Sequence, residues 1–166
     1  MSEFEHQRHK PPAGLQQPRE LVLALPQLRS NVNLARIVRA AGCSGVRRVV
    51  ACGTGRIDEK IARDALEVVT VERPRSLGPA VRQLRAEGYR LVGLEQTSNS
   101  RPLPEYQFAR RTALVIGHER LGIVAEILET LDDVVEIPVF GRPLSFNVAT
   151  ATAMALYEYC RQFPAG

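Results

Sequence analysis

Cysteine, aromatic residues and long apolar runs are all scarce in this 166-residue chain, and each scarcity excludes a class of protein. The three cysteines, Cys43, Cys52 and Cys160, have no C-x-x-C spacing, which argues against a metal site or a disulfide framework and favours a reducing, cytoplasmic setting. With no Trp and 5% aromatic residues, the chain is a poor candidate for a protein that binds single-stranded nucleic acid by stacking bases on aromatic side chains. No apolar run approaches about 20 residues and the polar amino terminus has no signal core, so we expect no membrane association.

The composition that remains is typical of one folded domain with a basic surface. Hydrophobic residues make up 45% and charged residues 24%, as in ordinary soluble proteins, and the length is sufficient for one core. The net charge of +4 comes mostly from arginine, and the sequence pI is about 9.3. Such a balance permits a polyanionic partner without requiring one.

Residues 1–19 combine basic side chains with prolines and show no periodicity, which indicates a flexible basic arm ahead of a domain at residues 20–162. The basic side chains are those of His6, Arg8, His9, Lys10 and Arg19. Two interpretations stay open. The segment is either a frayed terminus or an arm that contacts phosphates or a partner subunit.

From residue 20 onward, short apolar runs alternate with helical patterns. Strands are predicted at 20–25, 46–51, 67–71, 89–95, 112–116 and 134–137. Helices are predicted at 31–41, 58–66, 76–87, 122–130 and 147–160, with a proline-containing loop at 101–108. Gly42 and Gly88 are expected to end two helices, and Asp58 to begin another. The alternation indicates an α/β fold with a mostly parallel sheet and helices on both faces, in which ligands bind beyond the carboxyl ends of strands.

The segment 134–151 has the most distinctive pattern in the chain. An apolar strand ends at Pro138, and the loop 139–144 that follows is shaped by glycine and proline. Ser145 is a good N-cap for the closing helix. Asn147 places a polar amide at the mouth of a helix made mostly of small residues. This amide either caps the helix or bonds a ligand or a second loop.

Polar residues also follow the earlier strands. Asn33 lies near the start of the first helix, where Arg36 and Arg39 share one face. The two arginines form either a phosphate clamp or a solvated basic face. The run EQTS at 95–98 occupies a ligand-facing position but is a weak signal by itself.

The loop after the strand at 112–116 has two glycines that allow the backbone to approach a ligand, with Glu119 between them. His118 has no carboxylate or cysteine spaced to orient it, so we assign it no acid/base role. Gly53 and Gly55 could begin a dinucleotide-binding loop, but the third glycine position holds Asp58 and the helix after it is short.

Three of these stretches together resemble one family, the SpoU (TrmH-like) 2′-O-ribose RNA methyltransferases of the SPOUT superfamily. Residues 33–39 resemble its N-x-x-x-x-x-R motif, and residues 114–122 are similar to its strand and G-x-E-x-x-G loop. Residues 137–148 are similar to its I-P…S-L-N-V signature. Phe146 stands where the family more often has Leu, and His118 where Asn is common.

This resemblance implies an α/β domain with a deep carboxyl-terminal trefoil knot, formed by the loops at 94–95, 117–122 and 137–146. It implies a homodimer in which the helix at 148–159 packs on its mate. It also implies S-adenosylmethionine as the cofactor, in a pocket that includes Leu94, Gly117, Ile137 and Phe146.

The implied reaction is in-line attack of a ribose 2′-hydroxyl on the sulfonium methyl group, which depends on alignment of the reacting atoms. By matching position, Arg39 is the catalytic arginine, Asn33 its supporting amide, Glu119 the orienting carboxylate, and Ser145 with Asn147 the polar pair of the loop. Because arginine is not normally deprotonated, we expect Arg39 to hold a phosphate and the 2′-oxygen. A phosphate oxygen or a water then accepts the proton.

The expected substrate is structured RNA, with tRNA favoured over rRNA. Its phosphates are expected to contact exposed arginines, namely Arg29, Arg36, Arg47, Arg48, Arg110 and Arg111. Two alternatives from other classes remain. One is a Rossmann-like nucleotide-binding enzyme that uses the loop 53–55, and the other is a catalytically inactive RNA-binding module.

Overall fold

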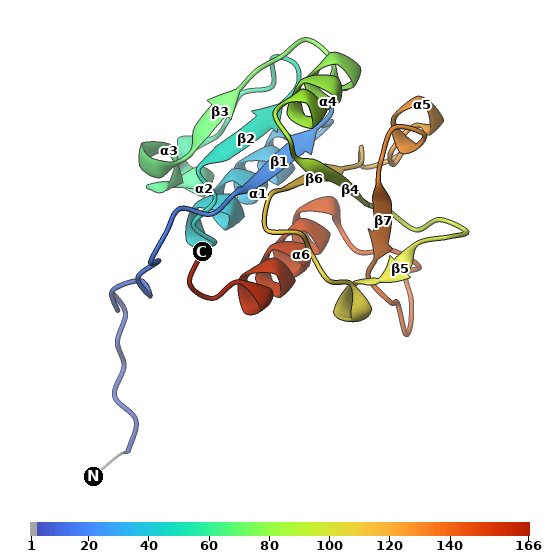
Figure 1. The fold of residues 1–166 in the computed structure, drawn as a ribbon. Coiled ribbons are helices and arrows are strands. Elements are labelled where there is room, and N and C mark those ends of the chain that lie inside the picture. Colours follow the sequence, from blue (N-terminus) through green and yellow to red (C-terminus); the bar gives the residue numbers. More distant parts are fainter. Residues whose placement is uncertain (1–2) are drawn as a thin grey trace.

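The computed structural model describes residues 3–166, which form an α/β domain around one seven-stranded sheet (Figure 1). All six strand pairings are parallel, and the strand order is β3-β2-β1-β6-β4-β7-β5. The strands are β1 Leu21–Leu25, β2 Arg48–Ala51, β3 Thr70–Glu72, β4 Arg90–Leu94, β5 Arg101–Pro102, β6 Thr112–Ile116 and β7 Asp133–Glu136. The helices are α1 Asn31–Cys43, α2 Glu59–Ala62, α3 Ala65–Val68, α4 Leu77–Ala86, the 3-10 turn η1 Leu103–Glu105, α5 Ala125–Leu128 and α6 Val148–Gln162.

Helices cover both faces of the sheet, which confirms the predicted α/β class with a mostly parallel sheet. Alternate residues of β1 point to opposite sides, so that Leu23 packs into the core under α1 and α6 while Val22 packs into the core under α4 and α5. Every residue of β1 is buried because both faces are covered. Because the central strands are all parallel, their carboxyl ends meet at one edge of the domain, where the helices α1 and α6 begin (Figure 1).

Two predicted boundaries are wrong in the first half of the chain. The first helix continues through Gly42 and ends at Cys43, with Ser44 as its C-cap, and the glycine with positive φ after it is Gly45, at 73°. Gly42 lies inside the helix and allows α3 to approach closely, because a Cβ there would be 2.8 Å from the Cβ of Ala65. The predicted helix at 58–66 is two short helices, since Arg63 takes a φ of 53° between them. As a result, the next strand begins at residue 70 instead of 67.

Two further differences concern short elements. The predicted loop at 101–108 contains the two-residue strand β5 and the turn η1. The predicted helix at 122–130 is reduced to the four residues of α5, because residues 117–123 form a separate hairpin. Asp58 and Gly88 act as predicted at the start of α2 and after the end of α4. Within residues 3–166, no helix is long and apolar enough to cross a bilayer.

The amino-terminal arm has no regular structure in its described part and extends away from the domain before β1 (Figure 1). Its last residues are tied to the end of the chain. The amides of Gln16 and Gln17 donate to the Ala165 carbonyl at 3.0 and 3.3 Å. The Arg19 guanidinium donates to the carbonyls of Ser44 and Phe163, both at 2.6 Å.

Candidate functional site

A cavity of about 500 Å³ lies at the carboxyl ends of β4, β6 and β7 and beside the start of α6. Its wall includes all four residues that the sequence predicts for the cofactor pocket, namely Leu94, Gly117, Ile137 and Phe146. They come from three different loops, which meet because parallel strands end at the same edge of a sheet. The predicted residues Glu119, Ser145 and Asn147 also line this cavity.

The loop after β6 is a tight hairpin closed by two backbone hydrogen bonds. His118 and Gly122 exchange N–H···O bonds, each at 2.9 Å. A Cβ on Gly117 would lie 2.7 Å from the carbonyl carbon of Gly122, so only glycine fits there. The His118 ring accepts hydrogen bonds at Nδ1 from the amides of Arg120 and Leu121, at 3.1 and 3.3 Å. His118 therefore shapes the turn.

Glu119 lies at the tip of this hairpin and joins it to the start of α1. Its carboxylate accepts hydrogen bonds from the backbone amides of Arg29 and Ser30, both at 2.9 Å, and from Asn33 Nδ2 at 3.2 Å. Burial alone raises the pKa of the Glu119 carboxyl, but these donors outweigh it and hold the pKa below its usual range. The side chain is therefore ionised at neutral pH, and both of its oxygens accept hydrogen bonds from the chain.

Asn33 and Asn147 continue the same chain of hydrogen bonds to the last helix. Asn147 Nδ2 donates to Asn33 Oδ1 at 3.2 Å, while Asn147 Oδ1 accepts from the amides of Ala149 and Thr150. Asn147 is thus the N-cap of α6, and the assignment of that role to Ser145 is wrong. Ser145 lies two residues before Asn147, in the cavity wall. Asn147 therefore caps its helix as one interpretation held, and its second bond goes to the first turn of α1 instead of to a loop.

Two predicted catalytic residues, Asn33 and Arg39, do not line the cavity. Asn33 is hydrogen-bonded to two residues of its wall, Glu119 and Asn147, whereas Arg39 has no such link. It lies six residues after Asn33 on α1, a distance of about 9 Å along the helix axis. Its side chain is exposed, and among residues 3–166 no hydrogen bond or ion pair holds its guanidinium. Arg39 is therefore free to bind a ligand that spans the surface beside the cavity.

Two carboxylates in the cavity wall had no role assigned from the sequence. Glu136, the last residue of β7, accepts a hydrogen bond from Ser100 Oγ at 2.8 Å. Glu95 follows β4 and accepts from the amides of Ile123 and Gln96, both at 2.9 Å. Their only signal in the sequence is a position at or just after the end of a strand, which many residues share.

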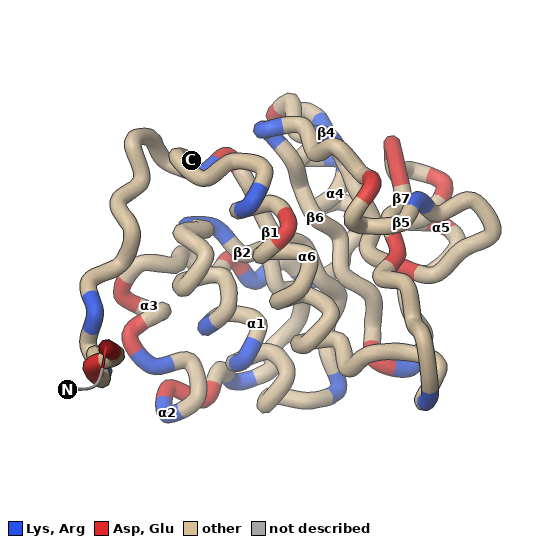
Figure 2. The backbone as a smooth tube through the Cα atoms, turned by 90° about the horizontal axis from the view of Figure 1, so that it is seen from below, with Lys and Arg blue, Asp and Glu red and all other residues tan. Residues whose placement is uncertain are grey.

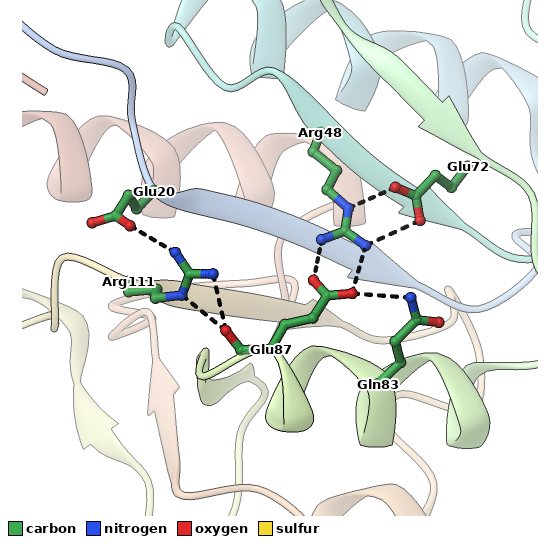
Figure 3. A network of polar contacts seen from close by, with 6 residues as sticks. All are labelled: Glu20, Arg48, Glu72, Gln83, Glu87 and Arg111. Atoms are coloured by element: carbon green, nitrogen blue, oxygen red, sulfur yellow. Dashed lines mark hydrogen bonds and ion pairs between the residues drawn. The ribbon is translucent and has the colours of Figure 1, made fainter.

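Half of the arginines predicted to contact RNA form ion pairs at the amino ends of the strands. Figure 3 shows two of them, Arg48 and Arg111. The Arg48 guanidinium lies between Glu72 and Glu87, with closest contacts of 2.6 and 2.5 Å. Arg110 and Arg111 both pair with Glu20. Arg48 and Arg111 are therefore held by short contacts with acceptors of the chain itself, while Arg110 keeps a longer contact of 3.5 Å with Glu20.

The other basic residues form a more open surface on the side of α1. Figure 2 shows Lys and Arg positions along α1 and around α2. Arg29, Arg36 and Arg47 are exposed, and within the described part of the chain their side chains have no charged partner. The loop 53–55 is occupied by its own chain, since the Gly53 amide donates to the Pro74 carbonyl at 2.9 Å and Arg73 donates to the Gly53 carbonyl. This loop offers little of the open backbone that a dinucleotide-binding turn needs.

A parallel sheet covered on both faces, with a cavity and converging amides and carboxylates at the ends of its strands, defines an α/β ligand-binding protein. Residues 20–157 match the model of the SpoU rRNA Methylase family. The chain belongs to this family, as its sequence motifs predict.

The chain is also similar to individual family members. It is 31% identical over 146 residues to the tRNA (guanosine(18)-2′-O)-methyltransferase of Escherichia coli. The matched region covers 86% of this chain and 64% of that protein. The chain is 42% identical over 90 residues to TARBP1 of Mus musculus, a tRNA (guanosine(18)-2′-O)-methyltransferase, covering 54% of this chain and 6% of that protein. The chain therefore spans less than two thirds of the length of these relatives.

Among solved structures, the Aquifex aeolicus TrmH/SpoU tRNA modifying enzyme is similar with a TM-score of 0.83 and 25% identity, over 90% of this chain and 78% of that one. The SpoU methyltransferase AviRb of Streptomyces viridochromogenes, solved with the cofactor AdoMet, shares the fold at a TM-score of 0.78 and 24% identity. That likeness covers 92% of this chain and 64% of AviRb.

Proposed function

We propose that this protein transfers a methyl group from S-adenosylmethionine to a ribose 2′-hydroxyl of structured RNA, with tRNA favoured over rRNA. The observation that carries this proposal is the hydrogen-bond chain from Glu119 through Asn33 to Asn147 at the edge of the cavity. Membership of the SpoU family supports the reaction type. The E. coli relative, named as a tRNA (guanosine(18)-2′-O)-methyltransferase, supports tRNA as the substrate.

The cavity fits S-adenosylmethionine in size and chemistry. Its volume of about 500 Å³ lies in the range of about 300–1,000 Å³ typical of cofactor sites. Leu94, Ile137 and Phe146 give an apolar wall, and Gly117 brings backbone close to the space because it has no side chain. When bound, S-adenosylmethionine supplies an electrophilic methyl group.

The chain's own residues have separate tasks in this proposal. Glu119 accepts three hydrogen bonds, so it orients the loop at residues 29–30 and the side-chain amide of Asn33 and does not act as a base. Ser145 remains in the cavity wall as a polar contact. Arg39 has a free guanidinium fork that matches a phosphate and stabilises negative charge on the 2′-oxygen. An RNA phosphate oxygen or a water accepts the proton, because arginine keeps its own.

We further propose a homodimer formed through α6. A groove of about 470 Å³ lies between α6 and η1, and its walls are almost entirely apolar. Met154 and Tyr157 line it on the outer face of α6, and Pro104 lines it on η1. Tyr157 is 76% exposed, as is typical of a side chain that packs against a partner. Ile137 lines both this groove and the cofactor cavity, so the dimer interface would adjoin the site.

We also propose that residues 20–162 form the methyltransferase domain and that its carboxyl-terminal part is threaded into a trefoil knot. Two observations support the knot. β4 lies between β6 and β7, although both follow it in the chain. The segment after β7 also returns over the loop after β4, where Gln96 Nε2 donates to the Leu144 carbonyl at 3.3 Å.

The test is a calorimetric titration with S-adenosylmethionine and S-adenosylhomocysteine, followed by methyl transfer to separate tRNA and rRNA pools. We expect saturable binding at one site per chain and ribose methylation of tRNA. Arg39→Ala should abolish transfer and leave cofactor binding intact. The control Arg82→Ala, an exposed arginine on the other face of the sheet, should keep both. RNA binding without cofactor binding would instead identify an inactive RNA-binding module.

A further inference from the structure

Glu95 and Gln96 connect the loop after β4 to the two other loops around the cavity. Glu95 Oε2 accepts from the Ile123 amide at 2.9 Å, at the end of the hairpin after β6. Gln96 Nε2 donates to the Leu144 carbonyl at 3.3 Å, in the loop after β7. Two adjacent residues therefore bridge all three loops that form the cavity wall.

The Glu95 carboxylate is closely surrounded by backbone. Its Oε1 accepts from the Gln96 amide at 2.9 Å, so each oxygen has one amide donor. A Cβ on Gly122 would lie 2.2 Å from Glu95 Oε2, which means that glycine at 122 is what lets the carboxylate reach the Ile123 amide. The Ile123 side chain is 6% exposed and anchored in the core.

These contacts fix one end of the hairpin that carries Glu119. The other end is Gly117, which continues directly from the buried strand β6. Residues 118 and 122 are joined by the two backbone bonds of the hairpin. With Ile123 held by Glu95, neither end of the hairpin is free to shift, and Glu119 stays within 3.2 Å of Asn33 Nδ2.

We propose that Glu95 is a positioning residue of the cofactor site, which holds the 117–123 hairpin so that Gly117 forms the cavity wall and Glu119 engages Asn33. This inference rests on the proposed methyltransferase function. Glu95 acts through backbone, and a carboxylate suits the task because it presents two acceptors and no donor to two amides. An amide side chain at this position keeps one acceptor and places an NH₂ group against the other amide.

The test compares Glu95→Ala and Glu95→Gln with the control Glu126→Ala, which removes an exposed carboxylate on α5. For each variant we would measure the Kd for S-adenosylmethionine, kcat and KM for tRNA, and the thermal midpoint. Glu95→Ala should weaken cofactor binding about tenfold to a hundredfold and lower kcat. Glu95→Gln should weaken it about threefold to tenfold, since one bond remains. KM for tRNA should stay within about twofold, and Glu126→Ala should match the wild type.

The outcomes separate this inference from the proposed function. If the wild type binds S-adenosylmethionine and both Glu95 variants bind it equally well, the positioning role is refuted and the methyltransferase proposal stands. A lower thermal midpoint with an unchanged Kd would equally refute it, since that pattern reports a purely structural role. If the wild type itself binds no cofactor, the proposed function fails and the inference fails with it. Should Glu95→Ala not fold, the Glu95→Gln variant decides by the same criteria.

Discussion

Glu119→Gln and Glu119→Ala remove different numbers of the hydrogen bonds that join the hairpin after β6 to the start of α1. Oε1 of Glu119 accepts from the Ser30 amide and from Asn33 Nδ2, while Oε2 accepts only from the Arg29 amide. Glutamine can keep its oxygen in the Oε1 position, so it loses one bond and the negative charge. Alanine loses all three bonds.

The size of each effect follows from this count. A hydrogen bond to a charged group contributes about 1.5–3 kcal/mol, and the bond from the Arg29 amide is at the low end because water can replace it. We therefore expect Glu119→Gln to lower the free energy of unfolding by about 1.5 kcal/mol and Glu119→Ala by about 4 kcal/mol. In a domain of this length, these losses correspond to decreases in Tm of about 5 °C and about 12 °C.

The assay is thermal unfolding followed by circular dichroism, with Asn33→Ala combined with each Glu119 variant. Because Glu119→Ala removes the hydrogen bond to Asn33, its effect and that of Asn33→Ala should be less than additive, by about 1 kcal/mol. Glu119→Gln keeps this bond, so its effect should add to that of Asn33→Ala. Equal losses for the glutamine and alanine variants, or full additivity of Glu119→Ala with Asn33→Ala, would refute the view that this carboxylate is a three-bond anchor.

Three other perturbations test separate parts of the structure. The pKa of Glu119 is lower in the folded chain than in the unfolded chain, so the unfolded state takes up a proton at a higher pH. The free energy of unfolding should therefore fall as the pH drops below about 4.3, and it should fall less steeply in Glu119→Gln. Equal slopes of this free energy against pH in the two proteins, measured by denaturant titration, would contradict the prediction. Arg48→Ala should lower the free energy of unfolding by about 2 kcal/mol, because it removes the ion pairs with Glu72 and Glu87. The cofactor Kd should not change, because the network in Figure 3 is remote from the cavity. An unchanged midpoint of chemical denaturation would contradict this prediction. Gly117→Ala should weaken cofactor binding in calorimetry by more than about tenfold, since its Cβ would meet Gly122 backbone at 2.7 Å; wild-type affinity would show that the hairpin can move.

The sequence was sufficient to predict the alternating strands, the parallel sheet and most members of the site. Runs such as 112–116 match their strands because fully buried strands are continuously apolar. β5 was missed because its two residues, Arg101 and Pro102, carry no periodic pattern. The end of α1 was misplaced because Gly42 and Gly45 carry the same local signal, and only the proximity of Ala65 decides between them.

The connections between site residues could not be predicted from local patterns. Asn33 and Glu119 were identified separately by motif position, but their hydrogen bond joins residues 86 positions apart. Arg48 was predicted to contact RNA because basic side chains are usually exposed; its enclosure by Glu72 and Glu87 depends on how β3 and α4 pack. Glu95 was noted only as part of a polar run, and its role depends on Gly122 lying beside it in space.

The hydrogen bond between Asn33 and Asn147 has a consequence for how the protein becomes active during synthesis. It joins residues 114 positions apart, near the two ends of the domain. A nascent chain that has emerged only as far as β7 has its sheet strands but lacks Ser145, Asn147 and one wall of the cavity. Such a chain cannot close the site around a ligand. The complete cavity wall therefore exists only once α6 has been synthesised and has docked beside α1.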